Sequence, residues 1–278
     1  MIRKSVSSVE NARREAEGSE EPVSVIDMAE VLAWVREGGA HARSFFNNVR
    51  AERKADRSWV TQADREVEQL LRERIAARYP EHGVMGEEQG VGAVDREFVW
   101  CIDPVDGTSA FVAGLPTWCI SLGLMRAGAP YLGAIYLPIL DDCYWADASG
   151  PAYRNDIPIA VSDHAAIDSN DWLAVPSTAH RSFQLTFPGK ARCLSSVAAD
   201  CCYVARGSAV GALIGRASLW DLAAGFAILR AAGGAMVHLS GAPVEPALLL
   251  DGRRLPEPIL ISSPAMLDSI RGTVARRG

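Results

Sequence analysis

Residues 100–109 read WCIDPVDGTS, and this stretch is the most informative part of the sequence about the fold. The apolar run that leads into it, residues 98–102, is short and uninterrupted, which is typical of a strand buried on both faces. Asp103 and Asp106 then stand on either side of a proline, whose fixed φ favours a turn that lets both carboxylates converge. Gly107 allows a close backbone turn, and the residues after it can begin a helix whose free N–H groups attract phosphate. The stretch therefore predicts a strand that ends in oxygen ligands of the kind that Mg²⁺ prefers.

Three further acidic positions could complete such a site. Glu87 lies in the motif Gly-Glu-Glu, after a short strand-like segment. Asp64 and Asp221 each occupy the first turn of an expected helix, over residues 64–79 and 219–232. Taken singly, these patterns also fit an ordinary turn, a solvated loop and simple helix caps. Their joint occurrence favours one site built from four stretches of the chain.

The composition argues against several classes of protein. The 278 residues are 49% hydrophobic and 22% charged, as in ordinary globular proteins, and the formal net charge is −6. This charge argues against nucleic acid or an acidic membrane as a partner. The six cysteines show no metal-ligand spacing and mostly sit in apolar runs, as expected of thiols in a reducing compartment. The polar N-terminus is unlike a secretory signal and no apolar stretch could span a bilayer, so we expect a cytoplasmic protein.

Helical and strand-like patterns mix without strict alternation, which favours a layered α+β or α/β fold. We expect a mobile N-terminal lead-in (residues 1–24), an N-terminal α+β half with most metal ligands (25–145) and a C-terminal α/β half with Asp221 and the substrate-specificity wall (146–278). Further expected elements are a helix over residues 26–49 that Gly38-Gly39 loosens midway, strands over 118–125 and 131–137, and a mixed helical region over 197–215.

Four motifs together resemble one family of phosphatases. They are KADRSWVTQAD at residues 54–64, the Gly-Glu-Glu motif at 86–88, DPVDGTSAF at 103–111, and WDLAAG at 220–225 with Ala232-Gly233-Gly234 after it. In order and spacing they resemble the inositol monophosphatase family, within the lithium-sensitive, Mg²⁺-dependent sugar-phosphatase superfamily. The resemblance covers roughly residues 30 to 270.

The resemblance implies a layered αβαβα sandwich of the inositol monophosphatase and fructose-1,6-bisphosphatase type, commonly a homodimer. It also implies two to three Mg²⁺ ions, inhibition by Li⁺, and water activated by metal as the nucleophile, with Glu87 taking part in catalysis. Its metal ligands would be Glu87, Asp103 and the carbonyl of Val105 for one ion, Asp103, Asp106 and Asp221 for a second, and Glu87 through waters for a third. Asp64 and Thr108 would orient the attacking water, and the amides of Gly107 and Thr108 would bind the phosphate.

The expected substrate is a small phosphate monoester, such as a sugar, cyclitol, histidinol or nucleotide phosphate. Residues 201–220 contain no Asp or Glu, and Leu213 stands where the family's ring-binding Glu is expected. Since a pocket without that acid loses its basis for recognising ring hydroxyls, we expect inositol 1-phosphate to be a poor substrate. The candidate substrate-binding residues are Ser195, Ser196, His180, Arg181 and Arg206, with Arg216 nearby. These arginines could meet a second phosphate or simply be surface residues.

Two other functions remain open at this point. A phosphatase of the haloacid-dehalogenase type also contains an Asp-Gly-Thr element, but its nucleophile and second acid are two residues apart, whereas Asp103 and Asp106 are three apart. A regulatory member of the same fold would bind metal without turnover. For the expected homodimer, the apolar strands over residues 118–124 and 131–140 are candidates for the contact face.

Overall fold

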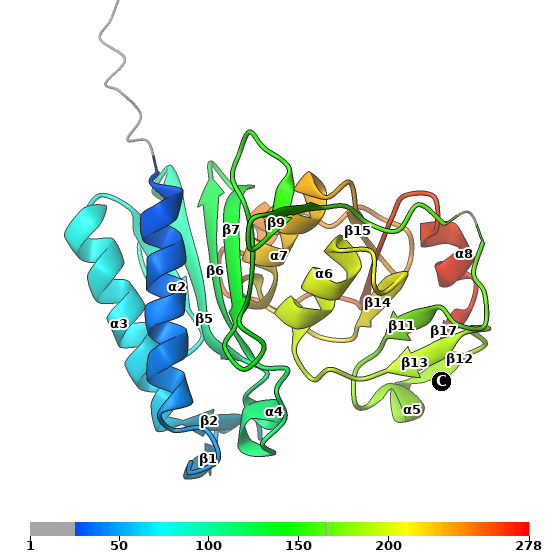
Figure 1. Ribbon diagram of the computed structural model, residues 1–278, viewed down its shortest axis with the longest axis horizontal. Coiled ribbons are helices and arrows are strands. Elements are labelled where there is room, and N and C mark those ends of the chain that lie inside the picture. Colours follow the sequence, from blue (N-terminus) through cyan, green and yellow to red (C-terminus); the bar gives the residue numbers. More distant parts are fainter. Residues whose placement is uncertain (1–25, 165, 278) are drawn as a thin grey trace, which may run out of the picture.

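Two β-sheets are interleaved with three layers of helices along the long axis of the molecule (Figure 1). The computed structural model describes residues 26–164 and 166–277, so the expected lead-in over residues 1–24 lies outside the described residues. Helices α2 and α3 form the first layer, α6 and α7 lie between the sheets, and α8 packs on the far sheet. The αβαβα sandwich expected from the sequence is confirmed.

The first sheet has eight strands in the order β10-β9-β8-β7-β6-β5-β3-β4, and includes strands from both sides of residue 146. Its elements and the helices and short strands that precede or connect them are α2 (Met28–Arg43), β1 (Ala51–Arg53), β2 (Trp59–Thr61), α3 (Gln62–Arg78), β3 (Gly83–Gly86), β4 (Gly90–Val91), β5 (Phe98–Asp106), α4 (Thr108–Val112), β6 (Cys119–Arg126), β7 (Ala129–Leu137), β8 (Asp142–Ala146), β9 (Ala152–Arg154) and β10 (Ile157–Ile159).

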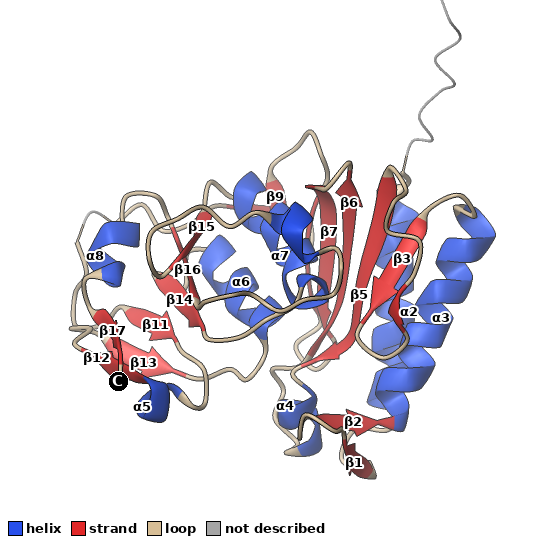
Figure 2. Ribbon diagram, turned by 180° about the vertical axis from the view of Figure 1, so that it is seen from behind, coloured by secondary structure: helices blue, strands red, loops and turns tan. Residues whose placement is uncertain are grey.

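The second sheet has five strands in the order β13-β11-β14-β16-β15 (Figure 2). The elements of this part are β11 (Trp172–Ala174), α5 (Ala179–Ser182), β12 (Phe183–Leu185), β13 (Lys190–Arg192), α6 (Val197–Ala205), β14 (Gly211–Ile214), α7 (Leu219–Ala231), β15 (Ala235–His238), the 3₁₀ helix η1 (Pro246–Leu249), β16 (Ile259–Ser262), α8 (Leu267–Arg271) and β17 (Val274–Arg276). Strands β12 and β17 form a separate two-stranded ribbon.

Three local predictions from the sequence were wrong. Helix α2 ends at Arg43 rather than near residue 49, and it passes through Gly38-Gly39 without a break. A Cβ at Gly39 would lie 2.6 Å from the ring of Tyr136, so the glycine pair lets the helix pack closely on β7 instead of loosening it. Residues 197–215 divide into helix α6 and strand β14, because the short apolar run at their end pairs with β11 and β16.

Strand β5 does not stop before the two aspartates, as the sequence suggested, but continues to Asp106. Its pairing with β6 is irregular between Asp103 and Asp106. Pro104, which lies in this irregular segment, has no N–H to donate to a ladder, so a break in register costs the sheet little there. The irregularity takes the place of the predicted turn. Because of it, the side chains of Asp103 and Asp106 do not have to follow the regular alternation between the two faces of the sheet.

Strands β6 and β7 are the centre of the first sheet and are covered on both faces. Helix α2 contacts them from one side and α7 from the other. Of residues 131–140, only Ile139 and Leu140, beyond the end of β7, are exposed hydrophobic side chains. A dimer face that includes these strands stays a prediction, and Ile139 and Leu140 are the exposed apolar side chains that it could use.

Two further properties concern the whole described chain. All six cysteines are free thiols, and five of them are buried. Over residues 26–164 and 166–277, no helix combines the length and the apolar character that crossing a membrane requires.

Helix α7 approaches the first sheet so closely that two strand positions have no room for a side chain. A Cβ at Gly123 would lie 2.6 Å from the amide nitrogen of Ala224, and one at Gly133 would lie 2.4 Å from the Ala224 carbonyl oxygen. Both neighbours are backbone atoms and cannot rotate away. This contact sets the position of α7, and with it the position of Asp221 near the start of that helix.

We expect Gly133→Ala to lower the free energy of unfolding by about 1–3 kcal/mol, because it forces α7 away from the sheet. Chemical denaturation measures the change. The matched control is Gly272→Ala, where φ is −61° and the nearest neighbour of a Cβ lies at an ordinary 3.6 Å. Equal stability of the two variants would contradict the close approach of α7.

Candidate active site

Three carboxylates from distant parts of the sequence meet at one point. Glu87, Asp103 and Asp221 each offer an oxygen, and these oxygens all lie within 4.8 Å of one another. They come from the turn after β3, from β5 and from the first turn of α7. An oxygen-only set of this kind suits a hard divalent cation.

The turn that carries Glu87 is held by a buried acid on α3. The Glu68 carboxylate accepts hydrogen bonds from the amides of Glu88 (2.7 Å) and Gln89 (3.0 Å). It also pairs with Arg72 at 2.8 Å, which offsets its charge. A Cβ on Gly86 would lie 2.3 Å from a Glu68 oxygen, so glycine is required for this approach. Glu68 therefore positions Glu87 without belonging to the acidic cluster.

Asp221 and Asp64 act as helix caps and face the site at the same time. The Asp221 Oδ2 atom accepts from the amide of Ser218 at 2.6 Å in a capping box at the start of α7. Asp64 forms the equivalent box with the amide of Thr61 at 2.8 Å at the start of α3. Each carboxylate keeps a second oxygen, so the capping and the functional interpretations of these residues hold together.

The second oxygen of Asp64 contacts Thr108. The hydroxyl of Thr108 lies 3.1 Å from Asp64 Oδ1 and 3.1 Å from the carbonyl oxygen of Val105. The structure thus brings together Asp64 and Thr108, the two residues expected to orient water, beside the Val105 carbonyl that is expected to bind metal. Gly107 (φ +88°) directly precedes Thr108 in the chain. A Cβ on Gly107 would lie 2.9 Å from the carbonyl oxygen of Ser195.

Asp106 lies outside the group of three oxygens and is held by the start of α6. The hydroxyl of Ser196 donates to Asp106 Oδ2 at 2.6 Å, and the amides of Val197 and Ala198 donate to the same carboxylate. Its charge nevertheless acts on Asp103 and Asp221, whose pKa values it raises. Ser196 therefore stands beside the acidic cluster as the support of Asp106.

Burial and mutual repulsion disfavour the charged forms of these acids. Burial, then the charges of Glu87, Asp106 and Asp221, raise the pKa of Asp103 well above its usual range. Burial, then Glu87 and Asp106, raise the pKa of Asp221, and burial raises that of Asp106 against its hydrogen bonds from α6. Burial also raises the pKa of Asp64. Since ionised carboxylates at such distances need a compensating cation, the donor set fits Mg²⁺.

One cation of the chain already reaches this cluster. The Lys54 ammonium lies 2.8 Å from Glu87 Oε1 and also binds Glu88. Burial lowers the pKa of Lys54, but the two glutamates outweigh it and raise the pKa overall. Lys54 thus stays charged and offsets part of the negative charge of the acidic cluster.

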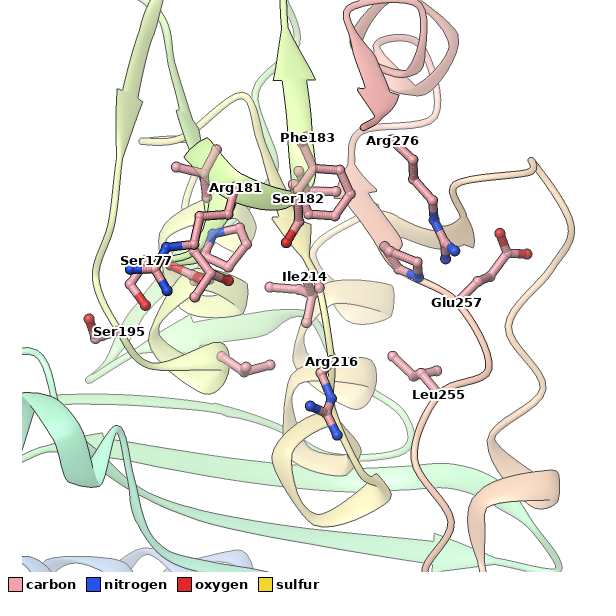
Figure 3. A pocket seen from close by; sticks show the side chains of 18 of the residues that line it. Ser177, Arg181, Ser182, Phe183, Ser195, Ile214, Arg216, Leu255, Glu257 and Arg276 are labelled. Carbon is pink, nitrogen blue, oxygen red and sulfur yellow. The ribbon is translucent and has the colours of Figure 1, made fainter. Parts of the chain in front are cut away.

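Two hollows adjoin the carboxylates. The first, which we call the acidic hollow, has a volume of about 420 Å³, and its lining includes Lys54, Glu87, Arg216 and Asp221. The second, which we call the arginine-lined hollow, has a volume of about 790 Å³ and lies between the first sheet and the C-terminal part (Figure 3). Its lining includes Asp106, Arg181, Ser195, Ser196, Asp200, Leu213, Ile214, Arg216, Leu255, Glu257, Arg276 and Arg277.

Of the five expected substrate-binding residues, three line the arginine-lined hollow and two do not. Ser195, Ser196 and Arg181 line the arginine-lined hollow, whereas His180 is exposed and absent from its lining. Arg206 lies elsewhere, because its guanidinium binds the Tyr144 hydroxyl at 2.9 Å and faces Asp142. Ile214 lies in the middle of the hollow in Figure 3, whereas the side chain of its lining neighbour Leu213 is fully buried in a hydrophobic cluster with Leu173 and Phe183.

Sequence reasoning missed several residues of the site. Asp200 stands one position before the acid-free segment 201–220, is 5% exposed, and its Oδ1 has no hydrogen-bond partner among the described residues. Its position in the first turn of a helix capped by Ser196 was the available signal. Lys54 and Glu68 were within or next to a quoted motif, but only the fold shows what they touch. Arg276 is too far along the chain for any local pattern to connect it with the site.

Comparison with known proteins agrees with this geometry. A profile described as the inositol monophosphatase family matches residues 20–265. The chain is 30% identical over 242 residues to the fructose-1,6-bisphosphatase/inositol-1-monophosphatase of Aquifex aeolicus, covering 82% of this chain and 90% of the relative. It is 32% identical over 226 residues to inositol monophosphatase 1 of Solanum lycopersicum, covering 76% and 83%. Among solved structures it is similar to an inositol monophosphatase (IMPase) of Thermotoga maritima, with a TM-score of 0.77, 26% identity and coverage of 87% and 94%.

The fold and the matches define the chain as a phosphatase that hydrolyses phosphoric monoesters. It belongs to the inositol monophosphatase family. This membership excludes the alternative of a haloacid-dehalogenase phosphatase.

The raised pKa values of Asp64, Asp103, Asp106 and Asp221 predict how pH and metal act on stability. The metal-free folded protein holds protons on these acids more tightly than the unfolded chain, so raising the pH weakens folding. Mg²⁺ bound to the ionised carboxylates would reverse this loss. We expect 10 mM Mg²⁺, about the scale that weak sites require, to raise Tm by at least about 4 °C more at pH 8 than at pH 5.5. Calorimetry with EDTA as the reference checks this, and an equal shift at both pH values would contradict it.

Asp200 predicts a separate pH effect. Burial, then the charge of Asp106, raise the pKa of Asp200 well above its usual value. Its ionisation therefore opposes folding as the pH rises above the unfolded pKa. Relative to Asp200→Asn, which cannot ionise, the wild type should lose at least about 1 kcal/mol of stability between pH 5 and pH 8. A stability difference independent of pH, measured by urea denaturation in EDTA, would show that Asp200 is charged in the folded protein.

Proposed function

We propose that this phosphatase hydrolyses a small phosphate monoester with Mg²⁺ as cofactor. The observation that supports the proposal is the meeting of Glu87, Asp103 and Asp221 oxygens within 4.8 Å, beside the hydrogen-bonded pair Asp64 and Thr108. These are the components of hydrolysis by activated water, and neither a histidine nor a covalent intermediate is required.

The proposed roles follow from the contacts of each residue. Glu87, Asp103, Asp221 and the carbonyl of Val105 would hold the ions, with Asp106 at the second position. Bound Mg²⁺ would lower the pKa of water and offset charge on the phosphoryl group. Two to three ions and inhibition by Li⁺ belong to the same proposal.

Thr108 is proposed to orient the attacking water. Its Oγ1 atom can donate its proton to Asp64 Oδ1, at 3.1 Å, and this leaves its oxygen lone pairs free to accept from a water molecule. Asp64 is suited to keep that proton orientation, because Thr61 fixes its other oxygen and the whole side chain is buried. Gly107 is the N-cap of α4 and Thr108 is the first residue of that helix. Their amides would donate to phosphate oxygens.

The proposed substrates are sugar, cyclitol, histidinol or nucleotide phosphates. Leu213 and Ile214 are among the residues that line the arginine-lined hollow, and neither side chain can accept a hydrogen bond from a ring hydroxyl. This supports the expectation that inositol 1-phosphate is a poor substrate. The name of the Aquifex relative supports a sugar phosphate as an alternative. Cytoplasmic residence and a homodimer also remain predictions.

The deciding experiment is phosphate release from inositol 1-phosphate, fructose 1,6-bisphosphate, histidinol phosphate and adenosine 3′,5′-bisphosphate, with and without Mg²⁺. We expect Mg²⁺-dependent release, a loss of at least about 100-fold in Asp103→Asn, and inositol 1-phosphate near the bottom of the ranking. Asp95→Asn, an exposed acid between β4 and β5, is the matched control and should keep wild-type rates.

Two outcomes would overturn parts of this proposal. Equal release with and without Mg²⁺, or an unaffected Asp103→Asn variant, would remove the metal mechanism. Calorimetric Mg²⁺ binding with no release from any substrate would instead favour the regulatory member of the fold.

A further inference from the structure

The arginine-lined hollow carries more positive charge than a pocket for neutral sugar hydroxyls needs. Arg181 comes from α5, Arg216 from the connection between β14 and α7, and Arg276 from β17. Figure 3 shows the three side chains around the same hollow, with Ile214 between them. Three segments that are far apart in sequence thus place guanidinium groups around one apolar surface.

These guanidinium groups are not neutralised within the described chain. Over residues 26–164 and 166–277, no carboxylate lies within ion-pairing distance of any of the three. The Nε atom of Arg181 donates to the ring of His180 at 3.3 Å. A histidine ring does not neutralise a guanidinium group as a carboxylate does. By contrast, Arg126 and Arg154 each pair with a carboxylate at 2.8 Å.

The acids in the lining do not balance this charge. Asp106 is held by the start of α6 and belongs to the acidic cluster. Asp200 is buried, and burial raises its pKa. Glu257, at the rim, accepts from the hydroxyl of Ser240 at 2.6 Å and faces His238. The hollow therefore presents a net positive lining to any ligand that enters it.

The backbone fixes two of the arginines relative to each other. Arg276 pairs with Phe183 in the β12–β17 ribbon, and Phe183 follows Arg181 by two residues in the chain. The next residue, Arg277, strengthens this junction, because its amide donates to Ser182 and its Nε donates to the Phe183 carbonyl, both at 3.0 Å. A backbone held in a paired ribbon loses less entropy on binding a ligand than the backbone of a free terminus.

Arg216 connects the hollow with the acidic cluster. It lines both the arginine-lined hollow and the acidic hollow, where Glu87 and Asp221 lie. A ligand whose phosphoryl group sits at the carboxylates can therefore extend past Arg216 toward Arg181 and Arg276. The volume of about 790 Å³ is in the range of pockets that hold small organic molecules.

We propose that Arg181, Arg216 and Arg276 form a subsite for a second anionic group of the substrate, either a phosphate or a carboxylate. The inference rests on the proposed function for the position of the first phosphoryl group. Guanidinium groups bind both kinds of oxyanion through paired N–H donors, while the apolar surface of β14 offers nothing to a neutral polyol. The substrate is accordingly a phosphate ester that carries a second negative charge at its far end.

The test compares substrates that differ by the second anion alone. The pairs are fructose 1,6-bisphosphate against fructose 1-phosphate, and 3-phosphoglycerate against glycerol 3-phosphate. We expect the wild type to prefer the member with the second anionic group in at least one pair, and the pair that shows it distinguishes phosphate from carboxylate. In Arg181→Gln and Arg276→Gln, that preference, measured as a ratio of kcat/KM, should fall about 10- to 100-fold through KM.

Arg43→Gln, an exposed arginine on α2, is the matched control and should leave the ratio unchanged. An unchanged ratio in both hollow variants, or no preference for a second anion in either pair, would overturn the subsite while leaving the phosphatase proposal intact. Binding of fructose 1,6-bisphosphate to the Ca²⁺-loaded protein, measured by calorimetry, gives a readout without turnover. If no substrate is hydrolysed but this binding weakens about tenfold or more in Arg276→Gln, the subsite stands and the proposed reaction fails.

Discussion

The repulsion between clustered carboxylates is the constraint on which the rest of this structure depends. Glu87, Asp103 and Asp221 bring oxygens within 4.8 Å of one another. Two unit charges at that distance repel by roughly 3–4 kcal/mol at an effective dielectric constant of 20, so the arrangement does not form by itself. The chain must hold it with rigid elements, and a cation at the centre turns the same repulsion into affinity.

Each acid is held by a different device. Glu68 on α3 holds the turn that carries Glu87, Ser218 caps Asp221, and the irregular end of β5 presents Asp103. The absence of side chains at Gly123 and Gly133 sets the depth of α7, and therefore the distance from Asp221 to the sheet. Packing far from the carboxylates thus determines the geometry at the carboxylates.

The two halves of the molecule divide the work of recognition. The names of the relatives cover different phosphate esters, since one is a fructose-1,6-bisphosphatase/inositol-1-monophosphatase and another an inositol monophosphatase. The arginine-lined hollow is built mostly by residues after 170, where the second sheet and the β12–β17 ribbon meet. Asp106, held by Ser196 and α6, and Arg216, which lines both hollows, couple the two regions directly.

The sequence by itself determined the features that depend on neighbours within one turn or one strand. The apolar run before Asp103, the cap positions of Asp64 and Asp221, and the layered fold could all be predicted, since local spacing controls where a side chain points relative to its own element. Tertiary structure alone decided that α2 passes unbroken through Gly38-Gly39, that Arg206 turns to Tyr144, and that Arg276 pairs with Phe183 in a ribbon. These outcomes depend on which surfaces pack and which strands pair across many residues, and a local pattern carries no information on those distances.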